Sequence, residues 1–289
     1  MQVTRLKTHP PTVVALGYFD SVHLGHRVIV DELLLLAKKH NAESVMSTFV
    51  GEQSIQVYTL YERAKILKDL KIDWLLEYPS TPEFFSQSAK KFLQSLKTGI
   101  SPKAIVVGHD FRFGKDRKGD INTLQEFCDG NNIELKIISP YPNAQERVST
   151  SQIKQLIQSG DLTIANGLLG APFAITDKVV SGNKVATTLG FPTANIRPNL
   201  LKLIPKDGVY KTQVTIELGV KKYQAITHVG TKPTFDSNDF IVETHIKDYS
   251  GKLYNKQITV EFLNFIRPIQ KFNSVGELKA QIQKDLKNL

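Results

Sequence analysis

The stretch TVVALGYFDSVHLGH, residues 12–26, decides the fold of the first half of the chain. Residues 12–16 form an apolar run rich in β-branched side chains, which predicts a buried strand. Gly17 and Asp20 predict a turn after it, and residues 26–40, with the block LLLLA, predict a helix. A buried strand that leads through a turn into a helix is typical of a parallel sheet wrapped by helices.

The same alternation continues to residue 169. Further strands are predicted at 42–49, 73–78, 103–108 and 133–139, and further helices at 59–71, 80–97, 121–128, 149–159 and 162–169. Thr59 with Glu62, and Ser80 with Glu83, have the spacing of capping boxes that open two of these helices. Ligands of a parallel sheet bind beyond the carboxyl ends of its strands, so we expect a site at residues 17–26 and 108–114.

The second half of the chain has a different pattern. The sequence Gly170-Ala171-Pro172 predicts a boundary between a module of residues 1–168 and a module of residues 169–289. Short β-rich runs follow at 178–180, 209–218, 223–226, 240–246 and 258–265, and Ser274 with Glu277 predicts a last helix. This spacing predicts a small antiparallel β-barrel with a C-terminal helix.

Composition excludes several classes of protein. Of the 289 residues, 41% are hydrophobic and 22% are charged, so the chain can bury a core and is not a disordered tail. Cys128 is the single cysteine, which excludes an intramolecular disulfide and a cysteine-based zinc site. The apolar run near the start is too short for a signal peptide, and no 18-residue apolar stretch follows. We therefore expect a cytoplasmic protein without a membrane span.

The net charge of +9 is uneven along the chain. Residues 169–289 contain 17 Lys and Arg against 10 Asp and Glu, whereas residues 1–168 are close to balance. A basic half is compatible with nucleic acid, a membrane surface or phosphorylated ligands. The lysines are scattered and form no block of five, which favours an ordinary solvated surface.

The first chemistry-bearing motif contains two histidines. His23 and His26 are three residues apart and share one face of a helical turn, at a helix start whose backbone N–H groups attract anions. Gly25 between them leaves room for a ligand to approach the backbone. The arrangement predicts a phosphate clamp. The alternatives are two structural histidines, or two ligands of a metal whose remaining ligands are not evident.

The second motif is GHDFRFGKDRKGD, residues 108–120. In an extended segment Phe111 and Phe113 point to one side and Arg112 to the other. The two rings could pack on a flat heterocycle, and Asp110 could bind its polar edge. The alternative is a strand-end loop with buried phenylalanines.

Two motifs carry oxygen ligands. In VSTSQIK, residues 148–154, Ser149 and Thr150 stand where they could cap the predicted helix. In LGFPTAN, residues 189–195, Thr193 and Asn195 offer oxygens that suit Mg²⁺ beside phosphate. Glu243 is the only carboxylate of the β-rich run 240–246. The alternatives are that Thr193 and Asn195 belong to a capped turn and that Glu243 is an exposed glutamate.

The pattern G-x-F-D-x-x-H-x-G-H after an N-terminal strand resembles the nucleotidylyltransferase signature. From about residue 10 to about residue 285, the chain is similar to the prokaryotic two-module riboflavin kinase/FAD synthetase family, which carries the block at residues 108–119 nearly verbatim. The resemblance implies an α/β parallel-sheet nucleotidylyltransferase (Rossmann-like) module followed by the small barrel. It also implies an FMN adenylyltransferase that uses Mg²⁺, ATP and FMN, with riboflavin as a further substrate.

The resemblance also implies roles for the motif residues. It makes His23, His26 and Glu243 catalytic, the last as base for the ribityl hydroxyl. Flavin would be bound by Asp110, Phe111 and Phe113, and Mg²⁺ by Thr193 and Asn195. ATP and its phosphates would be bound by Gly17, Phe19, Asp20, Gly25, Ser149, Thr150 and Lys154.

The chain departs from the family pattern at several positions. Ser21 replaces a glycine, Lys154 replaces an arginine, and Asp177 replaces the glycine that opens the kinase module. The kinase phosphate loop reads GNKVAT, residues 182–187, where the family has Gly-x-Arg-Gly. Val185 and Ala186 restrict a backbone that would need glycine to reach phosphate.

We therefore expect FAD synthesis from FMN and ATP, with slow or no phosphorylation of riboflavin. One alternative is a fully bifunctional riboflavin kinase/FMN adenylyltransferase. The other is a flavin-sensing regulator that binds RNA, although the barrel carries no aromatic RNA-binding motif. The expected partners are small nucleotides and flavins, neither a membrane nor nucleic acid is favoured, and the oligomeric state stays open.

Overall fold

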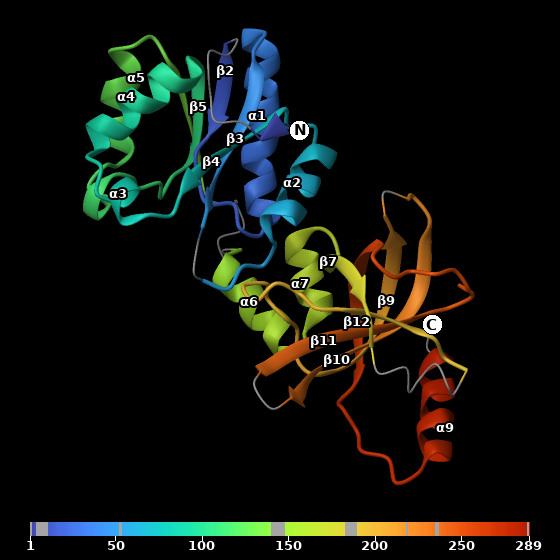
Figure 1. Ribbon diagram of the computed structural model, residues 1–289. Helices are drawn as coiled ribbons and strands as arrows, with labels where there is room; N and C mark the ends of the chain where they lie inside the picture. Colours follow the sequence, from blue (N-terminus) through green and yellow to red (C-terminus); the bar gives the residue numbers. More distant parts are fainter. Residues whose placement is uncertain are drawn as a thin grey trace. The chain divides into compact units, whose positions relative to one another are not determined.

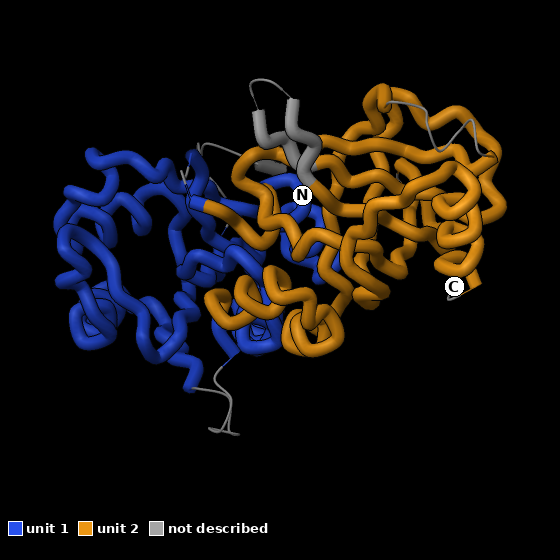
Figure 2. Tube along the Cα trace, turned by 90° about the horizontal axis from the view of Figure 1, so that it is seen from below, with its two compact units in different colours: residues 1–54, 60–149 blue, residues 55–59, 150–289 orange. Residues whose placement is uncertain are grey.

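The computed structural model describes residues 2–3, 11–51, 54–139, 148–182, 190–217, 219–234, 237–287 and 289. Backbone contacts divide the chain into two units, one of Met1–Ser54 with Leu60–Ser149 and one of Ile55–Thr59 with Thr150–Leu289 (Figure 2). The short segment Ile55–Thr59 thus belongs to the second unit although both of its neighbours belong to the first. The expected module boundary after residue 168 stays a prediction. The division by backbone contacts falls after Ser149 and places residues 150–168 in the second unit.

The first unit is built on a six-stranded sheet in which all neighbouring strands are parallel. Its strands are β1 (Gln2–Val3), β2 (Thr12–Ala15), β3 (Glu43–Val50), β4 (Trp74–Pro79), β5 (Pro102–Gly108) and β6 (Glu134–Ile138), in the order β1-β4-β3-β2-β5-β6. The five predicted strands are confirmed. The sequence did not predict β1, because two residues carry no periodicity.

Helices connect these strands (Figure 1). They are α1 (Leu24–His40), α2 (Leu60–Asp69), α3 (Pro82–Phe85), α4 (Ala89–Ile100) and α5 (Ile121–Asp129), with a 3₁₀ turn, η1 (Lys115–Arg117). The single helix predicted over 80–97 is wrong, because Ser88 caps a second helix within it. The cap predicted at Ser80 is also wrong: Thr81 caps α3, and its hydroxyl accepts from the Phe84 N–H at 3.3 Å.

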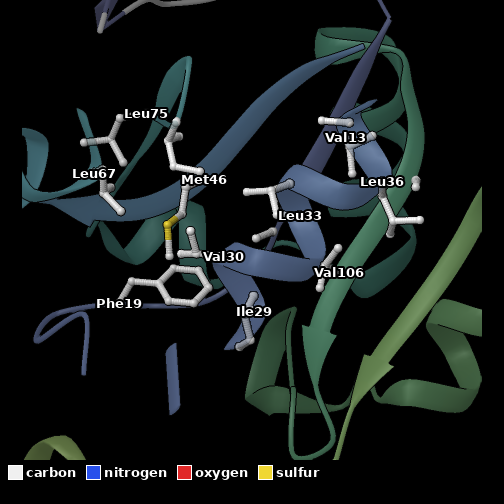
Figure 3. Packing of buried hydrophobic residues seen from close by; sticks show 14 of the residues in the cluster. Val13, Phe19, Ile29, Val30, Leu33, Leu36, Met46, Leu67, Leu75 and Val106 are labelled. Atoms are coloured by element: carbon white, nitrogen blue, oxygen red, sulfur yellow. The ribbon is translucent and has the colours of Figure 1, made fainter. Parts of the chain in front are cut away.

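The sheet is buried on both faces, as its apolar strands predict. On one face Leu33 and Val30 of α1 pack with Val13 and Met46 of the sheet (Figure 3). On the other face Val14 packs in a cluster to which α4 and α5 contribute side chains. Alternate residues of β2 therefore pack into the cores on opposite faces of the sheet. This packing fixes the position of the strand that leads to the histidine motif.

The strand order reverses between β2 and β5. These two strands are neighbours, with Ala15 paired to Val106, and their chains leave the sheet at the same edge. Such a reversal is where parallel α/β sheets bind ligands. The fold thus places the segments 17–26 and 108–114 side by side at the expected edge.

The second unit contains a closed barrel. Its strands are β7 (Phe173–Val180), β8 (Thr193–Ile196), β9 (Gly208–Ile216), β10 (Lys222–Thr234), β11 (Ser237–Ile246) and β12 (Gln257–Arg267), in the order β10-β11-β8-β7-β12-β9. Every neighbouring pair is antiparallel. The predicted barrel is confirmed. Strand β8, which follows Pro192 directly, was not predicted from the sequence.

Three helices accompany the barrel in the described part of the second unit: α6 (Thr150–Ser159), α7 (Leu162–Leu169) and the C-terminal α9 (Val275–Leu286). Ser274 caps α9, as predicted. Asp285 of α9, 3% exposed at its side chain, receives the guanidinium of Arg267 at 2.7 Å and so ties the helix to β12. Over the ranges that the structure describes, no helix combines the length and apolar character needed to cross a membrane.

Candidate active sites

The first candidate site begins where α1 begins. His23 is the N-cap of the helix, and its Nδ1 accepts a hydrogen bond from the His26 N–H at 3.2 Å. An Nδ1 that accepts carries no proton, so the neutral ring carries its proton on Nε2. His23 therefore serves the helix with one nitrogen and keeps an N–H donor on the other.

The two imidazoles form one unit. Their ring centroids are 3.7 Å apart and the ring planes differ by 13°. Burial lowers the pKa of His23 to about 4. Burial, followed by the nearby His23, lowers the pKa of His26 to about 3. Both rings are therefore neutral at physiological pH, and the pair presents N–H donors at the helix start.

Strand β3 holds the loop that carries the histidines. The Gly17 N–H donates to Ser47 Oγ at 3.1 Å, and Thr48 Oγ1 donates to the Tyr18 carbonyl at 3.2 Å. Arg63 of α2 reaches the same Tyr18 carbonyl. Sequence analysis missed these three side chains. Two hydroxyls at the carboxyl end of an apolar strand were the available signal for Ser47 and Thr48.

Two other predicted residues of this loop, Phe19 and Asp20, are buried. Phe19 is 3% exposed and belongs to the core, and Asp20 is 0% exposed. Gly25 does not face an open space, because a Cβ there would lie 3.1 Å from Cε1 of the His23 ring. The room that we expected for a ligand at Gly25 is therefore taken by the imidazole.

The second motif lies after β5, as predicted. Phe111 and Phe113 stack with centroids 5.4 Å apart, and Arg112 forms an ion pair with Asp120 at 3.6 Å. Phe113 is 7% exposed and packs into the core beside Phe92. Only Phe111 is partly exposed, so of the two rings it is the one that could meet a ligand.

Aromatic side chains also gather at the carboxyl ends of β3 and β4, and the sequence analysis did not single them out. Phe49 lies within 6.1 Å, centroid to centroid, of Tyr18, Tyr78, Phe84 and Phe85. Phe85 is 51% exposed and stacks on Phe49. The carboxyl edge of the sheet thus offers aromatic faces as well as histidines, and flat heterocycles pack well on such faces.

The third motif spans the border of the two units. Ser149 is the last residue of the first unit, whereas Thr150 opens α6 in the second. The Lys154 ammonium donates to the carbonyl of Ile55, which also belongs to the second unit.

The barrel brings together three predicted residues from two strands. Glu243 of β11 is paired in register with Asn195 of β8, and Thr193 Oγ1 donates to Glu243 Oε1 at 2.7 Å. Val242 and Thr244 on either side of Glu243 are fully buried. Because neighbouring residues of a strand face opposite ways, these three polar side chains share the other face of the sheet.

Asn195 has the properties expected of a residue that binds a cation. It is 5% exposed, and its Oδ1 is buried with no hydrogen-bond partner among the described residues. A buried carbonyl oxygen without a donor is unfavourable in the free protein and suits a cation that arrives with the substrate. A Cβ at Gly182 would lie 2.3 Å from Asn195 Nδ2, so a side chain there would displace the Asn195 amide. The remainder of the phosphate loop, residues 183–187, lies outside the described residues.

Both halves of the chain match family models. The FAD synthetase model matches residues 5–152 and the riboflavin kinase model matches residues 169–289. The chain thus combines a parallel α/β unit, which has a histidine pair at its strand-order reversal, with an antiparallel barrel. Together with the two family models, this architecture defines a two-module transferase.

Curated relatives match almost the full length. A protein of Listeria monocytogenes is 31% identical over 94% of this chain and 90% of its own length. Proteins of Buchnera aphidicola and Escherichia coli K12 are 33% and 32% identical over 97% and 94% of this chain, and 93% and 90% of theirs. All three are named bifunctional riboflavin kinase/FMN adenylyltransferase. The chain belongs to this family and is an enzyme.

A solved structure has the same architecture over both units. It is described as the crystal structure of a macrolide-efflux protein from Streptococcus pneumoniae and is 31% identical to this chain. Its TM-score is 0.86, over 98% of this chain and 95% of that one.

Proposed function

We propose that this protein is fully bifunctional: it phosphorylates riboflavin to FMN in the barrel and adenylates FMN to FAD in the α/β unit. The observation that carries the second reaction is the stacked histidine pair at the start of α1, at the strand-order reversal. The names of the relatives favour both activities over our expectation of an impaired kinase. The single cysteine suits a reducing compartment, and we place both reactions in the cytoplasm.

In the adenylyl transfer, an oxygen of the FMN phosphate attacks the α-phosphorus of ATP. The bond from that phosphorus to the bridging oxygen of the β-phosphate breaks, and pyrophosphate leaves. Little covalent chemistry falls to the protein, so positioning and charge stabilisation set the rate. The neutral rings of His23 and His26 donate hydrogen bonds to the phosphates. Phe111 provides an aromatic face for the flavin, and Ser149, Thr150 and Lys154 bind the pyrophosphate.

In the kinase reaction, the terminal ribityl hydroxyl of riboflavin attacks the γ-phosphorus of ATP, and ADP leaves. Glu243 takes the proton of that hydroxyl. The hydroxyl of Thr193 already donates to Glu243, so the carboxylate is held in place before substrate arrives. Thr193 and Asn195 would hold Mg²⁺, which neutralises phosphate charge when bound.

The test is to incubate the purified protein with Mg-ATP and either riboflavin or FMN, and to resolve the products by chromatography. We expect FMN and then FAD from riboflavin, and FAD alone from FMN. If riboflavin is not converted while FMN is, the kinase half of the proposal fails and the enzyme is an FMN adenylyltransferase only.

The alternative function, a flavin-sensing regulator that binds RNA, would give a different result. Such a protein would bind RNA with an affinity that falls steeply as salt rises, because phosphate contacts release counterions. A salt titration of RNA binding, carried out beside the two enzyme assays, separates the two functions.

A further inference from the structure

Helix α2 carries a buried arginine beside the histidine loop. Arg63 is 2% exposed, and a buried guanidinium is stable only when its N–H groups find acceptors. Its Nη1 donates to the Tyr18 carbonyl at 3.4 Å and to Thr48 Oγ1, and its Nη2 donates to the Phe49 carbonyl at 3.5 Å. One side chain therefore joins α2, the end of β3 and the loop after β2.

The loop that it holds is strained. Phe19, the residue after Tyr18, has φ +50°, and Val22 has φ +44°. Side chains disfavour this left-handed region, most of all when they are β-branched, and such conformations persist only where the surroundings enforce them. Arg63 and Thr48 both bind the carbonyl directly before Phe19. Both side chains therefore help to hold the first strained residue, which also packs in the core.

The strained residue in turn touches the catalytic pair. The Phe19 ring meets the His26 ring edge to face, with centroids 5.1 Å apart. A change in the Tyr18–Phe19 peptide would therefore move the surface against which the His26 imidazole rests. A displacement of about 1 Å in a group that contacts reacting atoms can lower a rate on the order of 10²-fold.

We propose that Arg63 is a positioning residue for the adenylyl transfer: it fixes the Tyr18 carbonyl and, through Phe19, the His26 ring. This inference rests on the proposed function of the first unit. In this role Arg63 acts through the Tyr18 carbonyl and Phe19 and not by touching substrate. A planar guanidinium serves acceptors in several directions at once, which the single ammonium of lysine does not do.

The test compares Arg63→Met, Arg63→Lys and Thr48→Val with Lys68→Met, which removes an exposed cation from the same helix. We expect Arg63→Met to lower kcat for FAD formation about 10²-fold. KM for ATP and FMN should stay close to the unmodified values. Arg63→Lys and Thr48→Val should lower kcat less, and Lys68→Met not at all. FMN formation from riboflavin, in the second unit, is the internal control for folding.

Several results would overturn the proposal. One is an unchanged kcat in Arg63→Met. Another is a raised KM for ATP at unchanged kcat, because this result would mean that Arg63 contacts substrate directly. If Arg63→Met loses both reactions together, Thr48→Val decides, because it keeps the side-chain volume and removes one acceptor of Arg63. An unchanged kcat there also overturns the proposal.

A measurement without substrate separates this proposal from the proposed function. NMR of the histidine rings, with His26 assigned from His26→Asn, should show its signals shifted in Arg63→Met and not in Lys68→Met. If the unmodified protein makes no FAD, the proposed function is wrong and the role in catalysis falls with it. Unshifted His26 signals would overturn the positioning itself.

Discussion

The imidazoles of His23 and His26 lie face to face, with ring centroids 3.7 Å apart. Two cations at this separation in a buried setting repel each other strongly, so the pair rests uncharged. The tautomer of His23 follows from its cap bond to the His26 N–H. Under the proposed function, phosphate would therefore meet imidazole N–H donors and the start of a helix, rather than permanent positive charge.

His26→Ala should remove most FAD synthesis. Loss of one preorganised donor lowers kcat on the order of 10²–10³-fold. The measurement is the rate of FAD formation from FMN and Mg-ATP. Riboflavin phosphorylation by the same protein sample should be unchanged, because Glu243 and its neighbours lie in the other unit. Full FAD synthesis by the variant would remove His26 from the mechanism.

The depressed pKa values predict how stability varies with pH. The pKa values of His23 and His26 are about 4 and about 3 in the folded protein, below the ordinary value of 6.5. Between pH 6.5 and about 4 the unfolded chain binds more protons than the folded protein. The free energy of unfolding is therefore highest above pH 6.5 and falls as the pH drops toward about 4. The slope reaches about 1.4 kcal/mol per pH unit for each histidine.

The test is urea unfolding at pH 7.5, 6.5 and 5.5. Unfolding is monitored by the fluorescence of Trp74, the single tryptophan, which lies in the first unit. The double variant His23→Asn with His26→Gln should lose less stability over this range than the unmodified protein. Equal losses would mean that the histidines titrate normally.

Lys154→Arg should be tolerated or should improve the KM for ATP, because arginine keeps the charge and adds a two-pronged contact with phosphate. Lys154→Ala should raise that KM. The ammonium donates to the Ile55 carbonyl, and this contact gives the competing structural explanation. Steady-state kinetics at varied ATP separate the two, since a purely structural lysine would leave KM unchanged in a stable alanine variant.

Glu243→Gln should abolish FMN formation from riboflavin and leave FAD formation from supplied FMN unchanged. Glutamine can still accept the hydrogen bond from Thr193, so the variant removes the base and retains the geometry. Removal of a general base lowers kcat about 10²–10⁴-fold. Unchanged riboflavin phosphorylation would exclude Glu243 as the base.

The kinase phosphate loop provides a gain-of-function test. If riboflavin phosphorylation is slow, Val185→Arg together with Ala186→Gly should accelerate it and leave FAD synthesis unchanged, because glycine frees the backbone to reach phosphate. Both rates are read from one product analysis. If the unmodified protein already makes FMN as fast as it makes FAD, the loop sequence does not limit the kinase.

The class of fold and the position of the first site could be read from the sequence. An apolar run such as residues 12–16 is a local property, and five alternations of strand and helix leave few topologies for a chain of this length. The same logic placed the segments 17–26 and 108–114 at one edge. Where local signals competed, as for Ser80 and Thr81, packing decided between neighbouring residues that could both cap.

Tertiary structure alone decided which side chains meet. No local pattern distinguishes Arg63 from an exposed helical arginine, because its three acceptors lie 14 to 45 residues away along the chain. The bond from Thr193 to Glu243 spans 50 residues. The His23 ring occupies the space beside Gly25 because the cap bond turns it there. Periodicity encodes which face of an element is buried, whereas the contacts that hold a site arise when distant elements pack, so the sequence determined the architecture and the folded chain determined the geometry of its chemistry.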